Sequence, residues 1–209
     1  EGLDRSEEVM RTLYSDEVYK KHLAKRNNKQ IIMLGFSDGT KDGGYLKANW
    51  QIYTSKEKLT TISEKNGVKV VFFDGRGGPP ARGGGKTHDF YASQGKTIAN
   101  NQIELTIQGQ TITSVFGNKD QAKFNFEQLL TAGIENDVFK SIKKDLNDKE
   151  RQLISELADI SYKKYSDLKA HPMFVPYLQE MSTLEYYGRT NIGSRPSKRG
   201  AGSELKFED

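Results

Sequence analysis

A glycine-rich stretch between two apolar segments carries the residues best suited to bind an anion. It reads FFDGRGGPPARGGGKTHDF from Phe72 to Phe90. Glycine loses more conformational entropy on ordering than any other residue, so this density of glycine indicates a backbone that must approach another group closely. Arg76 and Arg82 lie among the glycines, and a guanidinium group binds phosphate or carboxylate through two parallel hydrogen bonds. The stretch therefore predicts a site for an anionic ligand.

Two nucleotide-binding motifs match this stretch only in part. Residues Gly83 to Thr87 read GGGKT, like the end of a phosphate-binding loop, but Pro80 stands where that motif begins with glycine. Pro80 also takes the third glycine position of the dinucleotide fingerprint that starts correctly at Gly75 and Gly77. Because proline offers neither the backbone freedom nor the N–H group that these positions need, we exclude both motifs.

The segments around the stretch predict a β-α-β unit. Residues 30–36 and 68–73 are short apolar runs typical of buried parallel strands, and residues 45–65 show the apolar spacing of a helix. A loop with the sequence GFSDGTKDGG follows the first run, and the glycine-rich loop follows the second. Since the carboxyl ends of neighbouring parallel strands meet at one edge of a sheet, the two loops should lie together there.

Charged residues from both loops are expected to gather at this edge. Sites in α/β folds form where such loops converge, so we expect these residues to share one pocket. The alternative is that both loops are only tight turns between strand and helix, capped by Asp and Gly. The candidate members of the pocket are Asp38, Lys41, Asp42, Arg76 and Arg82.

The rest of the chain predicts mainly helices, so the expected fold class is helix-rich α/β. Residues 6–25 fit one charged amphipathic helix, with Val9, Leu13 and Val18 as packing positions. Residues 103–116 contain two β-rich runs around a glycine and predict a β-hairpin. Further helices are expected at residues 119–135, 148–168 and 172–180.

The end of the chain differs from the rest in composition. Residues 188–209 are polar, basic and glycine-rich, which is typical of a flexible loop or tail. The chain has no internal repeat and no low-complexity linker. We therefore expect residues 1–209 to belong to one structural unit.

The overall composition excludes several classes of protein. Lys and Arg number 32 against 28 Asp and Glu, and the net charge of +4 is too mild to indicate a nucleic-acid partner. The absence of cysteine excludes disulfides and thiolate chemistry, and leaves oxygen or histidine ligands for any metal. No apolar run is long enough to cross a membrane, and the first residues do not resemble a signal peptide. We therefore expect a soluble, cytoplasmic protein without a membrane partner.

Four segments resemble signatures of the phosphoenolpyruvate carboxylase family, in the family's order and at its spacing. They read GFSDGTKDGGYLKANWQIY, FFDGRGGPPARGGGKTHDFYASQG, LTIQGQTI and NIGSRPSKR, and lie between Ile31 and Arg199. The resemblance implies an enzyme that forms oxaloacetate and phosphate from phosphoenolpyruvate and bicarbonate with Mg²⁺ or Mn²⁺. It also implies a mostly helical, homotetrameric full-length enzyme around an eight-stranded TIM-like α/β barrel, of which this chain would hold some C-terminal strands.

The resemblance also implies roles for single residues. Asp38 matches a metal-binding carboxylate, and Lys41 matches a lysine of the catalytic set near the substrates. Arg76 matches an arginine that binds the phosphate of phosphoenolpyruvate, and Arg195 matches a further substrate-binding arginine of the active site. Simpler interpretations stand beside these: Asp38 as a helix cap, Arg76 as a structural ion pair, and Arg195 as a solvated charge.

The second arginine of the glycine-rich stretch matches a residue of a mobile loop. Arg82 resembles the arginine that serves catalysis and, in regulated members of the family, binds the carboxylate of an aspartate or malate inhibitor. The flexible part of that loop would be Gly83, Gly84 and Gly85. The resemblance thus implies a possible dicarboxylate effector.

Asp74 departs from the family pattern, which usually has a histidine there that helps to place bicarbonate. A carboxylate would repel bicarbonate unless a cation neutralised it. The histidine's role is therefore shared differently in this chain, or Asp74 binds metal, or it pairs with an arginine.

The resemblance covers a C-terminal part of the family's catalytic barrel. The family's catalytic histidine motif, its second metal-binding carboxylate and a final arginine have no match in these residues. We therefore expect the chain to act as part of a longer enzyme and to be inactive when isolated, with its strand edges covered by other chains. The alternative function is a stand-alone regulatory module that binds anions or dicarboxylates without turnover.

Overall fold

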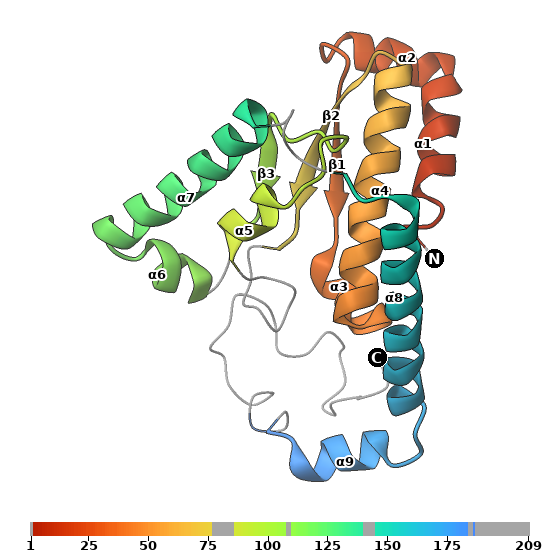
Figure 1. Ribbon diagram of the computed structural model, residues 1–209, viewed down its shortest axis with the longest axis vertical. Helices are drawn as coiled ribbons and strands as arrows, with labels where there is room; N and C mark the ends of the chain where they lie inside the picture. The colour runs from red at the N-terminus through yellow and green to blue at the C-terminus, as the bar shows by residue number, and fades with distance from the viewer. Residues whose placement is uncertain (1, 77–85, 108–109, 140–144, 184–185, 187–209) are drawn as a thin grey trace.

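A parallel sheet lies at the centre of the protein. The computed structural model describes residues 2–76, 86–107, 110–139, 145–183 and 186. In this part of the chain the sheet has the strand order β1-β2-β3, and both strand pairs are parallel. The strands are β1 (Lys29–Leu34), β2 (Lys69–Asp74) and β3 (Ile103–Leu105) (Figure 1).

Helices surround this sheet and make up most of the described residues. Figure 1 shows α1, α4 and α8 on one side of the sheet, and α6 and α7 beyond β3 on the other. The helices are α1 (Ser6–Ser15), α2 (Glu17–Ala24), α3 (Phe36–Gly43), α4 (Tyr45–Lys65), α5 (Thr87–Ala92), α6 (Gln110–Phe116), α7 (Lys119–Val138), α8 (Asp148–Lys169) and α9 (Phe174–Met181). The predicted helix-rich α/β class is therefore confirmed, whereas a complete barrel stays a prediction.

The predicted β-α-β unit is confirmed, with a short additional helix. Strand β1 leads into α3 and α4, and α4 returns the chain to β2. The strands pair in parallel register, with Ile31 opposite Val71 and Ile32 opposite Phe72. Helix α4 has the predicted bounds, because its apolar spacing fits a face that packs on the sheet.

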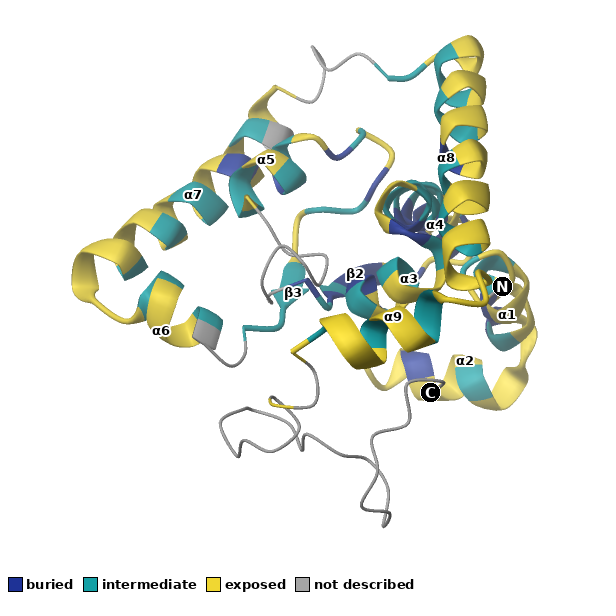
Figure 2. Cartoon of the chain, turned by 90° about the horizontal axis from the view of Figure 1, so that it is seen from below, coloured by how far each residue is buried: buried dark blue, intermediate teal, exposed yellow. Residues whose placement is uncertain are grey.

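Strand β2 and helix α4 form the centre of the hydrophobic core. Figure 2 shows the buried residues concentrated on these two elements, while α6, α7 and α8 are largely exposed or half-buried. Val71 and Phe72 are fully buried on β2, and Ile52, Leu59 and Ile62 are buried on α4. Helix α4 is therefore packed between the sheet, α1 and α8, and it contacts all three.

The helix predicted for residues 6–25 is divided in two at Asp16. This residue has an extended backbone, and its Oδ1 accepts a hydrogen bond from the Tyr19 N–H at 2.7 Å, so that it caps α2. Leu13 packs against the hydrophobic core, as predicted. Val9 and Val18 are exposed, contrary to their predicted packing role, and the buried side chains are Met10, Tyr14 and Leu23.

The β-hairpin predicted for residues 103–116 is wrong. Ile103–Leu105 form β3, which pairs with β2 in parallel, and Gln110–Phe116 form helix α6. The preference of β-branched residues for strands reflects packing on a half-buried sheet surface, and tertiary contacts override it here. Phe116 packs instead against Phe126 of α7, with 5.2 Å between the ring centroids.

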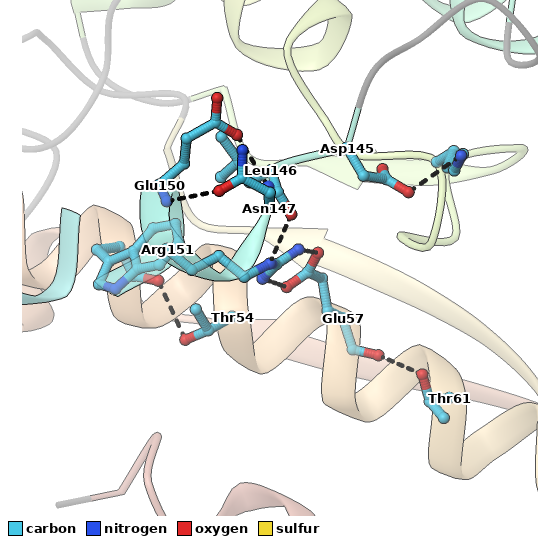
Figure 3. A network of polar contacts seen from close by, with 10 residues as sticks. Thr54, Glu57, Thr61, Asp145, Leu146, Asn147, Glu150 and Arg151 are labelled. Carbon is cyan, nitrogen blue, oxygen red and sulfur yellow. Dashed lines mark hydrogen bonds and ion pairs between the residues drawn. The ribbon is translucent and has the colours of Figure 1, made fainter. Parts of the chain in front are cut away.

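Helices α7, α8 and α9 lie within a few residues of their predicted positions, which confirms these three predictions. Polar contacts at its start hold α8 against α4. Asn147 caps α8 through a capping box with Glu150 (Figure 3). One turn further, the Arg151 guanidinium donates two hydrogen bonds of 2.7 Å to the carboxylate of Glu57 on α4, and a third to the Leu146 carbonyl. This bidentate pair fixes the start of α8 against the middle of α4.

We expect Arg151→Lys to lower the free energy of unfolding by about 1 kcal/mol, because lysine keeps the charge but loses the planar fork. Urea unfolding of the 209-residue chain can be followed by the fluorescence of Trp50, which donates a hydrogen bond to Ser155 of α8. Arg11→Lys is the matched control, since Arg11 pairs with Glu7 on the surface. An equal loss in both variants would contradict the prediction.

Candidate functional site

The two loops predicted to converge do begin at the same edge of the sheet. Strand β1 ends at Leu34 and strand β2 at Asp74, and these two residues are register partners. The N–H of Gly75 donates a hydrogen bond of 3.0 Å to the Leu34 carbonyl. A Cβ atom on Gly75 would lie only 2.9 Å from that oxygen, so this close approach between the ends of β1 and β2 requires glycine.

Arg76 follows directly and is almost completely buried. It is 6% exposed, and its guanidinium carbon lies 3.9 Å from the centre of the Phe90 ring and 5.9 Å from that of Phe36. Its Nε has no hydrogen-bond partner within the described residues, and no described carboxylate forms an ion pair with it. The ion pair of the simpler interpretation is therefore not found within the described part of the chain.

The charge of Arg76 is held in apolar surroundings. Burial lowers the pKa of its guanidinium, while the nearby Tyr91 and Asp74 oppose this effect. Arginine titrates so far above neutral pH that the group stays charged. A buried cation that stacks on an aromatic ring and has an unused N–H donor is well suited to bind an oxyanion.

Asp38 and Lys41 lie on α3, which begins where β1 ends. The Asp38 side chain is 84% exposed, and the Lys41 Nζ is 3.6 Å from its Oδ1. Gly35, not Asp38, is the N-cap residue of α3, so the simple capping interpretation does not hold. Asp38 belongs instead to the first helical turn, where a carboxylate is favoured by the helix dipole. Asp42, one residue after Lys41, is exposed.

The remaining predicted site residues lie outside the described residues. They are Arg82, Arg195 and the glycines Gly83, Gly84 and Gly85, and the predicted tail 188–209 lies there too. The shared pocket therefore stays a prediction. Cavities of about 520 and 610 Å³ occur in the described part, but they are lined by residues of other segments.

Asp74 has a partner that the sequence analysis did not name. Its side chain is fully buried, and the Lys56 Nζ lies 2.8 Å from both carboxylate oxygens and donates a hydrogen bond to Oδ2. The Tyr91 hydroxyl donates a second hydrogen bond of 2.9 Å to the same oxygen. Of the interpretations left open for Asp74, direct pairing with an arginine is therefore wrong, because the paired cation is a lysine.

The sequence did contain a signal for Lys56. It stands between Ile52 and Leu59 at helical spacing, on the face of α4 that packs against the sheet. Lysine is almost never fully buried unless it is paired, and Lys56 is only 2% exposed. A lysine on an apolar helix face therefore predicts a buried carboxylate nearby.

Burial dominates the electrostatics of this cluster. It lowers the pKa of the Lys56 amine, although Asp74 acts in the opposite direction. It also raises the pKa of the Tyr91 hydroxyl, and the neighbouring Asp74 raises it further. Tyr91 therefore stays protonated and remains a hydrogen-bond donor to the carboxylate.

Asp38 is the described carboxylate that the resemblance assigns to a metal, and its surroundings test whether it could serve as a ligand. No group of three or more His, Cys, Asp or Glu side chains able to hold a metal occurs among them. Asp38 offers an exposed carboxylate, and such oxygens are the ligands that Mg²⁺ and Mn²⁺ prefer. Asp38 therefore fits as a single ligand of such an ion.

None of the described helices is both long and apolar enough to cross a bilayer.

The described residues form a helix-rich α/β protein with a parallel sheet and a buried arginine just after the carboxyl end of β2. Comparison with known proteins identifies the family. The sequence profile of the phosphoenolpyruvate carboxylase family matches residues 1–207. A phosphoenolpyruvate carboxylase of Corynebacterium efficiens is 34% identical over 200 residues, which are 95% of this chain and 22% of that relative. The chain therefore belongs to the phosphoenolpyruvate carboxylase family, and spans about a fifth of the length of this relative.

We expect Asp74→Asn to lower the free energy of unfolding by about 3 to 5 kcal/mol, because it leaves the buried Lys56 without its counter-charge. Urea unfolding of the 209-residue chain measures the change. Asp159→Asn is the control, since Asp159 pairs with Lys47 on the surface and its loss should cost no more than about 0.5 kcal/mol. Similar losses of unfolding free energy in both variants would show that the buried pair contributes no more to stability than the surface pair does.

Proposed function

We propose that this chain is part of a phosphoenolpyruvate carboxylase, which forms oxaloacetate and phosphate from phosphoenolpyruvate and bicarbonate. The observation that carries the proposal is Arg76 at the carboxyl edge of the sheet, a buried guanidinium that stacks on an aromatic ring and whose Nε has no hydrogen-bond partner among the described residues. Membership in the family supports the proposal independently.

Arg76 would bind the phosphate group of phosphoenolpyruvate. In the proposed reaction bicarbonate attacks that phosphate, giving carboxyphosphate and an enolate, and the enolate then captures the CO₂ that carboxyphosphate releases. Every species on this path except CO₂ is anionic. A fixed cation in a water-poor site stabilises such charge more strongly than a cation in solvent does. Arg82 and Arg195, by their match to the family pattern, would add further positive charge.

Asp38 would hold Mg²⁺ or Mn²⁺ together with ligands from elsewhere in the enzyme. The bound ion supplies positive charge that stabilises phosphate and enolate oxygens. Asp38 suits this role because its carboxylate is exposed on the first turn of α3, next to the edge that carries Arg76. The ion pair with Lys41 is long, at 3.6 Å, and would leave the carboxylate oxygens accessible.

The buried pairing of Asp74 removes the objection that its charge would repel bicarbonate. Lys56 neutralises the carboxylate at 2.8 Å, so the pair as a whole presents no net charge to a substrate. We therefore propose that bicarbonate is placed by cations at this edge and not by the side chain at position 74.

The proposed activity is that of a longer enzyme, because the chain covers 22% of its relative. The exposed apolar side chains of α7 support this view, since further chain segments would bury them. They include Phe124, Phe126, Leu130, Ile134 and Val138.

A module that binds dicarboxylates without turnover is the competing function. It would bind aspartate or malate but form no oxaloacetate in any context.

We expect Arg76→Lys in the full-length enzyme to raise the KM for phosphoenolpyruvate by roughly tenfold or more, because lysine loses the planar fork and the ring stacking. A coupled assay of oxaloacetate formation measures the effect. Arg11→Lys is the control, because Arg11 forms only an exposed pair with Glu7. An unchanged KM in the Arg76 variant would remove this residue from the phosphate site.

We expect Asp38→Asn to raise the Mg²⁺ concentration needed for half-maximal rate by roughly tenfold, because the cation loses a charged oxygen ligand. The same assay with Mg²⁺ titrated at fixed substrate gives this value. Asp159→Asn, which removes an exposed carboxylate on α8, should leave the Mg²⁺ requirement as it was. If both variants respond to Mg²⁺ like the unmodified enzyme, Asp38 is not a ligand.

A further inference from the structure

A continuous chain of contacts connects the buried pair to Arg76. Lys56 of α4 binds Asp74 at the end of β2, and Asp74 accepts the hydrogen bond of Tyr91 on α5. The Tyr91 ring packs edge-on against Phe90, with 5.0 Å between centroids, and Phe90 carries the guanidinium of Arg76 at 3.9 Å. Contacts from α4, β2 and α5 thus lead to Arg76, two residues after the end of β2.

A second set of contacts places two cations beside the same aromatic ring. The Lys56 Nζ lies 5.3 Å from the centre of the Phe90 ring and 5.0 Å from that of Phe72. Arg76 is close enough to disfavour the charged form of Lys56. Asp74 is the nearby anion that offsets this repulsion.

Burying such a pair is costly in general. Desolvation of two charges often exceeds their mutual attraction, and apolar residues of similar size commonly stabilise a protein at least as well. Lys56 is 2% exposed and Asp74 is fully buried, so both charges meet the full desolvation cost. A gain in stability is therefore a weak explanation for this pair.

We propose that Lys56 and Tyr91 are positioning residues, which act through Asp74 and Phe90 to fix the guanidinium of Arg76 for an oxyanion. Neither residue touches the substrate. Lys56 holds the Asp74 carboxylate, Tyr91 couples that carboxylate to α5, and α5 presents the ring on which Arg76 stacks. The part that concerns phosphoenolpyruvate rests on the proposed function, whereas the part that concerns the position of Arg76 does not.

The test uses the full-length enzyme with Lys56→Met and Tyr91→Phe. Lys47→Met is the matched control, because Lys47 lies on the same helix and pairs with Asp159 on the surface. Two readouts are measured: the KM and kcat for phosphoenolpyruvate, and the rate at which phenylglyoxal modifies Arg76, found by mass spectrometry of its peptide. Thermal unfolding is recorded for each variant, so that loss of stability is separated from loss of position.

We expect Tyr91→Phe and Lys56→Met to raise the KM by roughly tenfold, with a smaller change in kcat, because each removes a hydrogen bond to a buried charge. Arg76 should react several-fold faster with phenylglyoxal in both variants and at the normal rate in the control. The double variant Lys56→Met with Asp74→Asn should recover part of the KM, because Asn can still accept the Tyr91 hydrogen bond.

A purely structural role predicts a different pattern. Folded variants that unfold at lower temperature but keep the KM and the Arg76 reactivity of the unmodified enzyme would overturn the proposal. If Lys56→Met does not fold, Tyr91→Phe decides, since it removes a single hydroxyl. If the unmodified enzyme forms no oxaloacetate, the proposed function fails, and the reactivity of Arg76 still decides the positioning proposal.

Discussion

Lys56 and Asp74 bury opposite charges against each other at the carboxyl end of β2, where neither reaches water. This pairing constrains how α4 lies on the sheet, because a shift along the strand or a rotation of the helix would separate the charges. An unpaired charge at this depth costs several kcal/mol, whereas apolar side chains tolerate small rearrangements. The ion pair therefore disfavours any packing of α4 on β2 that would separate the two charges.

The position of α4 affects two regions, the contact with α8 and the end of β2 that precedes Arg76. On one side, Arg151 of α8 binds Glu57, one residue after Lys56. On the other side, the same turn of α4 faces the end of β2, after which Gly75 packs closely against Leu34 and brings Arg76 to the edge. The structural helix contact and the candidate site thus depend on one turn of one helix.

The departure of Asp74 from the family pattern is best understood together with Lys56. A residue compared alone with its family equivalent suggests a lost function, since an acid has replaced a base. The structure shows instead a neutral buried pair that accepts a hydrogen bond from Tyr91. A buried charge must be compensated by a nearby partner, and Lys56 provides that compensation for Asp74.

The sequence by itself determined the family, the β-α-β unit, the bounds of α4 and the position of Arg76 at a strand end, since these depend on local periodicity and on motifs. It failed for residues 6–25 and 103–116, where Asp16 caps a second helix and parallel pairing with β2 replaces a hairpin. Only the tertiary structure paired Lys56 with Asp74 and placed Phe90 under Arg76. Such contacts join segments distant in the chain, and their energies depend on burial, which the order of residues alone does not specify.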